Sequence, residues 1–229
     1  MIEPDPGTGA RKRVILIDDH PIVATALQGV ALTIPNLEFV GAANSCAEGR
    51  DLIAREEPDL AIIDMSLPDG DGLDLIQAIR DLSVKIRILV FSMNQENAVG
   101  HRVLSAGAHG YLMKGAEISA IREAISVVLA GETFITPELA QQLARSTLPN
   151  QGEGQTLVGR LTNREFQVFR LLGEGLTTRE VSERLSIGVK TVESHRENIK
   201  NKIDCDNASQ LILAARDWIR GNTSDLGKI

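Results

Sequence analysis

The chain has 229 residues, which predicts two domains at roughly 150 residues per domain and is too short for three. Hydrophobic residues make up 43% and charged residues 24%, which excludes a disordered or fibrous chain, and aromatic residues make up only 3%, which favours aliphatic cores of helices and parallel strands. The net charge of -7 argues against nucleic-acid binding, but the charge is distributed unevenly along the chain. Residues 1–149 hold 12 Lys and Arg against 20 Asp and Glu, whereas residues 160–220 hold 11 Lys and Arg against 9 Asp and Glu.

The first segment, residues 1–12, is acidic and then basic, and is expected to be a tail. The apolar run that follows it stops at two aspartates, which excludes a secretory signal. No apolar stretch approaches the roughly 18 residues of a membrane span. Cys46 and Cys205 lie far apart without metal-type spacing, which fits a reducing cytoplasm. We therefore expect a cytoplasmic protein that does not contact membranes.

Residues 13–131 alternate short apolar runs with helical patterns, which predicts a doubly wound five-stranded parallel sheet, an α/β fold. Ligands of such sheets bind at the carboxyl ends of the strands. The expected strand and helix pairs are 14–17 and 22–33, 39–41 and 47–55, 60–63 and 73–80, 86–91 and 96–105, and 110–113 and 117–130.

Polar residues follow four of these strands: Asp18 and Asp19, then Asp64, then Ser92, then Lys114. Each alone has an ordinary interpretation as a helix cap, a turn hydroxyl or a surface charge. Together, three carboxylates at one edge repel each other unless a cation joins them, and their oxygens suit Mg²⁺. Asp64 could then act as a nucleophile that forms an aspartyl phosphate, with Ser92 and Lys114 on the phosphoryl oxygens.

His20 follows the acidic pair and invites a metal-ligand or general-base interpretation, but we expect it to cap the first helix. An enzyme is an alternative function, because aspartate-nucleophile phosphohydrolases also use an Asp, a Lys and magnesium. Such enzymes usually need a second Asp two residues after the nucleophile, and Ser66 occupies that position.

Residues 132–160 are expected to be a linker that contains a short amphipathic helix at 137–145. Its Gly-rich second half, 146–160, has no helical or strand periodicity.

The second domain is expected at residues 161–220, followed by a tail at 221–229. Thr162 with Glu165, and Thr177 with Glu180, have the spacing of capping boxes at two helix starts. A polar helix at 189–202 follows the helix that starts at Thr177, with a tight turn between them. Two short helices joined in this way predict a helix-turn-helix. An ordinary helical bundle with a solvated basic face is the alternative. The last helix, 207–220, has more apolar surface than one core needs, which suggests a dimer contact.

The motifs LIDDHP at 16–21, DMSLPDGDGLDL at 64–75, the serine at 92 and GYLMK at 110–114 resemble the receiver domain of two-component response regulators. The resemblance implies that Asp64 is the phosphoacceptor and that Asp18, Asp19, Asp64 and the backbone carbonyl of Ser66 surround Mg²⁺. It also implies that Ser92 and Lys114 bind the phosphoryl group, and that Tyr111 changes rotamer with Ser92.

Residues 161–218, with LTNREFQVFRLLGEGLTTREVSERL and KTVESHRENIKNKI, resemble the LuxR-type DNA-binding domain. The two matches together resemble a response regulator of the NarL/FixJ type, which implies phosphorelay signal transduction and transcription regulation rather than enzymatic activity. The implied partners are a sensor histidine kinase, promoter DNA and a second copy of the phosphorylated chain. The implied DNA-contacting residues are Thr178, Arg179, Lys190, Thr191, Glu193, Ser194, His195, Glu197, Lys200 and Lys202.

Two further possibilities stay open at this point. The helical domain could serve dimerisation alone, with the receiver passing phosphate to other proteins. Phe166 lies among polar neighbours, and it could pack under the linker or dock against the receiver.

Overall fold

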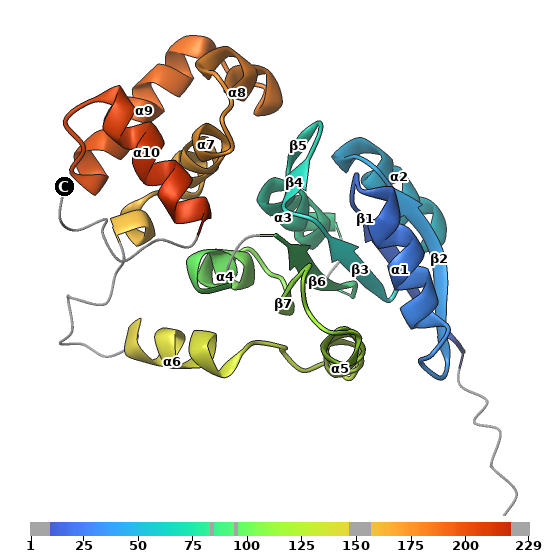
Figure 1. The fold of residues 1–229 in the computed structure, drawn as a ribbon. Coiled ribbons are helices and arrows are strands. Elements are labelled where there is room, and N and C mark those ends of the chain that lie inside the picture. Colours follow the sequence, from blue (N-terminus) through green and yellow to red (C-terminus); the bar gives the residue numbers. More distant parts are fainter. Residues whose placement is uncertain (1–9, 83–84, 94–95, 147–156, 221–229) are drawn as a thin grey trace, which may run out of the picture.

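The computed structural model describes residues 10–82, 85–93, 96–146 and 157–220 (Figure 1). An N-terminal α/β domain is followed by helix α6 and then by a C-terminal helical domain. Residues 1–9 of the predicted tail at 1–12, the predicted tail at 221–229 and the linker segment 147–156 lie outside the described residues. The predicted N-terminal tail extends too far, because Lys12 is already the first residue of a strand. None of the helices within the described ranges is long and apolar enough to cross a membrane.

The N-terminal domain contains the predicted five-stranded parallel sheet, in the order β2-β1-β3-β6-β7. Its strand residues are largely buried and aliphatic, which is the pattern of parallel strands covered by helices on both faces. The strands are β1 (Lys12–Ile17), β2 (Leu37–Ala43), β3 (Leu60–Ile63), β6 (Arg87–Ser92) and β7 (Gly110–Met113). The helices are α1 (Pro21–Ala31), α2 (Cys46–Glu56), α3 (Gly72–Leu82), α4 (Glu96–Ser105) and α5 (Ile118–Leu129).

Alternate side chains of each strand point to opposite faces of the sheet, so β1 contributes to two cores. Val14 and Leu16 belong to the cluster that contains buried residues of α1 and α5. Ile15 and Ile17 belong to the cluster that contains buried residues of α2, α3 and α4. The sheet is thus a middle layer, and its strand ends are left for polar groups.

A short hairpin after β3 differs from the sequence-based prediction, which had only a connecting segment there. Strand β4 (Ser66–Leu67) pairs antiparallel with β5 (Gly70–Asp71), and Ser66 lies opposite Asp71. Helix α3 begins directly after the hairpin, and the side chain of Asp71 accepts a hydrogen bond from the backbone N–H of Leu73 at 2.8 Å. The hairpin therefore connects the end of β3 rigidly to α3.

The segment between the domains also packs more closely than predicted. Phe134 forms a bridge with Gly110 at the end of the sheet, and Leu139 of α6 (Pro137–Ser146) is buried. A Cβ atom at Gly100 of α4 would clash with the side chain of Leu139. The 3-10 turn η1 (Leu157–Arg160) lies where the sequence showed no helical periodicity.

The C-terminal domain consists of α7 (Asn163–Gly173), α8 (Thr178–Arg184), α9 (Val189–Ile203) and α10 (Ala208–Ile219). Both predicted capping boxes are present at the starts of α7 and α8. Trp218 of α10 contacts the rings of Phe166 and Phe169 edge-on, at centroid distances of 5.3 Å and 5.9 Å. These aromatic contacts form the centre of the small core.

The half-buried His109 beside β6 predicts acid sensitivity of the α/β domain. Burial, together with Arg80 and Arg87, lowers the pKa of His109 from 6.5 to about 4. The backbone N–H of Ile88 donates to His109 Nδ1 at 3.1 Å. Between about pH 6.5 and pH 4, His109 takes up a proton in the unfolded chain but stays neutral in the folded chain. Protonation therefore favours the unfolded chain, and the free energy of unfolding falls as the pH is lowered through this range.

His109→Asn retains an acceptor for the Ile88 N–H but does not titrate in this range. We expect the free energy of unfolding, measured with urea, to decrease more for the wild type than for the variant between pH 7.5 and pH 5. A stability difference between the two proteins that stays constant over this range would contradict the assignment.

Candidate functional site

The predicted acidic residues meet at the carboxyl ends of β1 and β3. One ligand atom from each of Asp18, Asp19, His20 and Asp64 lies within 4.8 Å of the others. Asp18 and Asp64 are buried, whereas Asp19 and His20 are exposed. Backbone hydrogen bonds hold the two buried aspartates, because Asp18 N–H donates to Ala43 and Asp64 N–H donates to Ile17. The sheet itself therefore places these carboxylates side by side.

Lys114, which follows β7, is the cation of this cluster. Its Nζ lies 2.8 Å from Asp18 Oδ2 and 2.9 Å from Asp64 Oδ2, and its side chain is only 6% exposed. Burial raises the pKa of Asp64, while the contact with Lys114 opposes this shift. Burial alone would lower the pKa of Lys114, but hydrogen bonds to Asp18 and Asp64 raise it above its ordinary value. The lysine thus remains an ammonium that is shared by two carboxylates.

The cluster has the composition of a site for a hard divalent cation. Three carboxylates and one ammonium leave two uncompensated negative charges, which a divalent ion would neutralise. Asp18 Oδ2 is buried, and among the described residues it has no hydrogen-bond donor apart from the nearby ammonium of Lys114. Oxygen ligands at a partly exposed edge are the kind that magnesium prefers. The residues present are therefore compatible with Mg²⁺.

The other predicted site residues surround this cluster. Beside the larger effect of burial, the nearby backbone N–H of Ser66 acts to lower the pKa of Asp64. Ser92 is buried at the end of β6, and its carbonyl accepts from the N–H of Lys114 at 2.9 Å. Tyr111 is fully buried in the same apolar cluster as the residues of α2, α3 and α4, so its ring lies in the core. Whether Tyr111 changes rotamer stays a prediction.

The interpretation of His20 as a capping side chain is wrong. His20 stands at the N-cap position of α1, but its side chain makes no capping hydrogen bond. Its Nδ1 lies 2.9 Å from Asp18 Oδ1 and 2.8 Å from Asp19 Oδ1, because two carboxylates attract the ring more strongly than the helix end does. His20 therefore belongs to the acidic cluster.

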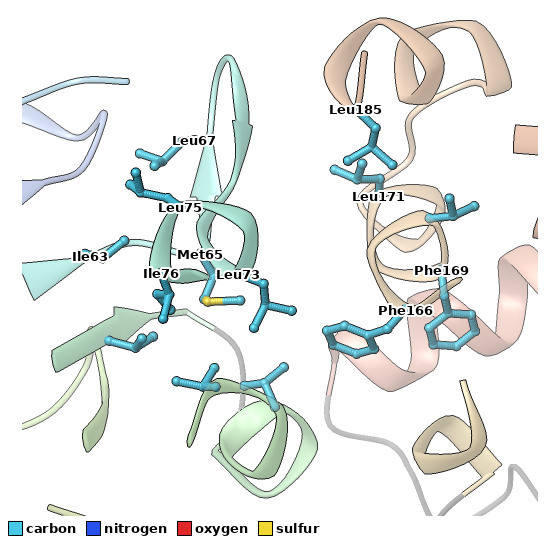
Figure 2. Close-up of a cluster of buried hydrophobic side chains, with 14 of the residues drawn as sticks. Ile63, Met65, Leu67, Leu73, Leu75, Ile76, Phe166, Phe169, Leu171 and Leu185 are labelled. Atoms are coloured by element: carbon cyan, nitrogen blue, oxygen red, sulfur yellow. The ribbon is translucent and has the colours of Figure 1, made fainter. Parts of the chain in front are cut away.

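Sequence reasoning missed the residues that join this site to the C-terminal domain. Arg170 of α7 is 1% exposed, and its guanidinium lies 2.7 Å from Asp71 and 2.6 Å from Ser66 Oγ. No motif predicts these partners, because they are about 100 residues away in the chain. Figure 2 shows buried side chains from both sides of this boundary, among them Met65 and Leu171.

A second arginine joins the domains from the opposite direction. Arg102 of α4 donates to the carbonyls of Val158 and Leu161 at 2.7 Å and 2.8 Å. Its guanidinium also lies 4.6 Å from the ring centroid of Phe166. Phe166 is therefore buried against both Trp218 of its own domain and a receiver-side arginine. One of the two possibilities left open for Phe166, a contact with the N-terminal domain, is therefore confirmed.

Helix α9 carries most of the predicted DNA-contacting residues, and six members of the predicted set are exposed. Val192, Ile199 and Ile203 are buried on the inner side of the helix. The Gly188 backbone begins the helix without a side-chain cap. The exposed members are Arg179, Lys190, Thr191, Glu193, Ser194 and Glu197.

The remaining four predicted DNA-contacting residues are half-buried and several have partners within the domain. Lys202 pairs with Glu165 at 2.7 Å, and Lys200 pairs with Glu197 at 2.9 Å. Thr178 accepts a hydrogen bond from Arg196. His195 Nδ1 is buried without a hydrogen-bond partner among the described residues. A role in DNA contact for these four stays a prediction.

Comparisons with known proteins agree with both halves of this description. Residues 14–126 match the model of the response regulator receiver domain, and residues 159–215 match that of bacterial regulatory proteins of the luxR family. The transcriptional activator protein ExaE of Pseudomonas putida is 34% identical over 202 residues, covering 88% of this chain and 94% of ExaE. The chain is a response regulator of the NarL/FixJ type.

Further relatives of this response regulator have the same organisation. The nitrate/nitrite response regulator protein NarL of Escherichia coli K12 is 31% identical over 190 residues, covering 83% of this chain and 88% of NarL. The structure of RcsB from Salmonella enterica serovar Typhimurium bound to promoter rprA has a TM-score of 0.72 at 23% identity, covering 92% of this chain and 98% of RcsB. At that identity the likeness shows the shared fold. The family consists of DNA-binding transcription regulators.

The central lysine gives a prediction about charge balance in the response regulator. Lys114→Met leaves Asp18 and Asp64 buried without their cation, and breaking such a pair costs about 3 kcal/mol of unfolding free energy. Mg²⁺ should raise the melting temperature of this variant more than that of the wild type, since the metal would replace the missing charge.

Lys12→Gln is the matched control, because Lys12 pairs with Asp59 at an exposed position. The decrease in unfolding free energy of this variant should be below about 1 kcal/mol, and Mg²⁺ should not change it. Equal losses in both variants, or an equal effect of Mg²⁺ on both, would contradict the cation role of Lys114.

Proposed function

We propose that residues 13–131 form a phosphorylation-controlled receiver and that residues 161–220 form the DNA reader it controls. Asp64 is the phosphoacceptor in this proposal. The observation that carries it is the group of three carboxylates around Asp64, with the ammonium of Lys114 at 2.9 Å. Such a charge arrangement receives a cation and an anionic phosphoryl group in the same place.

Magnesium is the proposed cofactor, held by Asp18, Asp19, Asp64 and the backbone carbonyl of Ser66. When bound, it would neutralise the carboxylates and orient the incoming phosphoryl group. Lys114, released from its contact with Asp18, would balance the phosphoryl oxygens. Ser92, buried at the end of the adjacent strand β6, would hydrogen-bond the same group. Tyr111 would follow Ser92 in changing conformation.

The proposed donor is a phosphohistidine of a sensor histidine kinase. A carboxylate oxygen of Asp64 attacks phosphorus, a P–O bond forms, and the P–N bond to the imidazole breaks. The imidazole nitrogen keeps the electron pair and takes up a proton. The reaction replaces one carboxylate charge by a dianionic group, which changes the local electrostatics of the strand ends.

Helix α9 is the proposed recognition helix for promoter DNA, and α10 is the proposed dimer contact. Lys190 and Thr191 would contact phosphates, while Glu193, Ser194 and Glu197 would face bases. His195, Lys200 and Lys202 would approach phosphates with Thr178 and Arg179 of α8. In this proposal Leu213, which is exposed on α10, lies in the contact with a second copy. The proposed compartment is the cytoplasm.

Acetyl phosphate tests this function without the kinase. We expect the wild type with Mg²⁺ to gain one phosphoryl group, to dimerise and to bind promoter DNA more tightly. Asp64→Asn, which keeps the shape of the side chain but not its nucleophilic charge, should gain none. Intact mass, gel filtration and DNA binding are measured on both proteins. Phosphorylation of Asp64→Asn to the wild-type extent would refute the assignment of the phosphoacceptor.

The exposed residues of α9 predict two separable effects on DNA binding. Lys190→Gln should weaken binding to all sequences similarly and reduce the slope of log K against log salt by about 1, because one phosphate contact is lost. Glu193→Gln should instead change the ratio of affinities between sequences.

Fluorescence anisotropy at several salt concentrations, with two promoter sequences, measures both quantities. Lys12→Gln, which removes a receiver-domain cation, serves as the control and should leave both unchanged. A salt slope unaffected by Lys190→Gln would argue against its phosphate contact.

A further inference from the structure

Helix α7 is buried on more sides than a two-layer helical domain requires. Every residue from Glu165 to Leu172 is buried, whereas a surface helix normally keeps one polar face in solvent. Phe166 and Phe169 pack on Trp218 within the domain. Gln167 and Arg170 face the other way, because both contact the N-terminal domain. One face of α7 is therefore built for the receiver.

Arg170 occupies a specific place on that face, the base of the β4–β5 hairpin. Its Nη1 donates to Ser66 Oγ at 2.6 Å, and its Nη2 donates to Asp71 Oδ2 at 2.7 Å. Ser66 and Asp71 are directly opposite each other in the hairpin register. The planar fork of an arginine bonds two such groups through two nitrogens held in a fixed geometry, whereas a lysine offers one nitrogen on a flexible stem. Arg170 thus bridges the two strands of the hairpin.

The bridged hairpin is the segment that follows Asp64 in the chain. Arg170 Nη2 also approaches the carbonyl of Met65 at 3.4 Å, and Met65 lies directly between Asp64 and Ser66 in the chain. Asp71 caps α3 through the N–H of Leu73. Fixing Ser66 and Asp71 together therefore fixes the backbone between Asp64 and α3.

We propose that Arg170 is a positioning residue for the metal site of the other domain. By bridging Ser66 and Asp71 it holds the loop whose Ser66 carbonyl would face Mg²⁺, so the docked C-terminal domain raises the affinity of the receiver for the metal. The inference rests on the proposed function, which supplies the magnesium site. Since coupling is reciprocal, Mg²⁺ in turn strengthens docking of the C-terminal domain.

Titration calorimetry of the full-length protein with Mg²⁺ alone tests this proposal. Partners that orient metal ligands change affinity by 10- to 100-fold, so we expect Arg170→Gln to weaken Mg²⁺ binding about tenfold. Ser66→Ala removes the hydroxyl but keeps the carbonyl, and should weaken it to a similar extent. The double variant should bind Mg²⁺ no more weakly than Arg170→Gln, because that variant has already lost the contact with Ser66.

Two further variants separate the bridge from other effects. Arg170→Lys retains the charge without the fork, and should stay weakened. Asp74→Asn removes a different interdomain contact, with Arg164 at 3.2 Å and Gln167 at 2.9 Å, and should bind Mg²⁺ like the wild type. Amide exchange at residues 66–73 should be faster in Arg170→Gln and Ser66→Ala than in Asp74→Asn.

Each other result decides against the proposal. Wild-type affinity in both Arg170→Gln and Ser66→Ala would overturn it while leaving the magnesium site intact. Wild-type Mg²⁺ affinity in Arg170→Lys would show that the charge at position 170 is sufficient without the fork. An equal loss of Mg²⁺ affinity in Asp74→Asn would show that any weakening of the docked arrangement has this effect. Equal Mg²⁺ binding by the wild type and Asp64→Asn would instead remove the magnesium site itself. Ser66→Ala makes the smallest change and keeps the test valid if Arg170→Gln does not fold.

Discussion

The repulsion among carboxylates at one edge of the sheet is the constraint on which the receiver depends. Parallel strands bring Asp18 and Asp64 together, and two unit charges within 4.8 Å repel by about 3 kcal/mol at an effective dielectric constant of about 20. The fold places Lys114 between them at 2.8 Å and 2.9 Å. One ammonium cannot balance three carboxylates, so the edge retains an attraction for further positive charge. This residual charge is the physical basis of the site.

A further buried carboxylate, Asp71, also needs a compensating cation, and it lies at the boundary between the domains. Its cation comes from Arg170 of the other domain, and both side chains are 1% exposed. Losing one member of a buried ion pair costs about 3 to 5 kcal/mol, because the other charge is left without compensation. Separation of the domains must therefore be accompanied by hydration of Asp71. Docking and the electrostatics near Asp64 are consequently linked through neighbouring residues of a single short hairpin.

The sequence predicted the parts of this arrangement that obey local or periodic rules. Apolar runs predicted the parallel sheet, and because parallel strands end at one edge, the positions of Asp64 and Lys114 predicted their meeting. Thr162 and Thr177 predicted their helix starts by the spacing to Glu165 and Glu180. These signals are local, so they could be read without knowledge of tertiary contacts.

The remaining features could not be predicted, for reasons that are equally physical. The two-residue strands β4 and β5 are too short for alternation to be visible. Arg170 looks like an ordinary solvent-facing residue of an amphipathic helix, and only a domain 100 residues away buries it. His20 was wrongly expected to cap α1, since the positions of both neighbouring carboxylates around its ring depend on the tertiary structure.

The docked arrangement also bears on how DNA reading could be controlled. Docking uses α7 and Arg184 of α8, which donates to the carbonyl of Leu67 at 2.6 Å. Thr191, Glu193 and Ser194 of α9 nevertheless remain exposed. Burial of these side chains is therefore not what would restrain DNA binding here. Dimers of helix-turn-helix domains need their two recognition helices about one helical turn of DNA apart, and a domain fixed to its receiver through α7 cannot reorient freely. Control through docking would accordingly act on the relative placement of the two α9 helices in a dimer, and not by burying the α9 helix of one chain against its receiver.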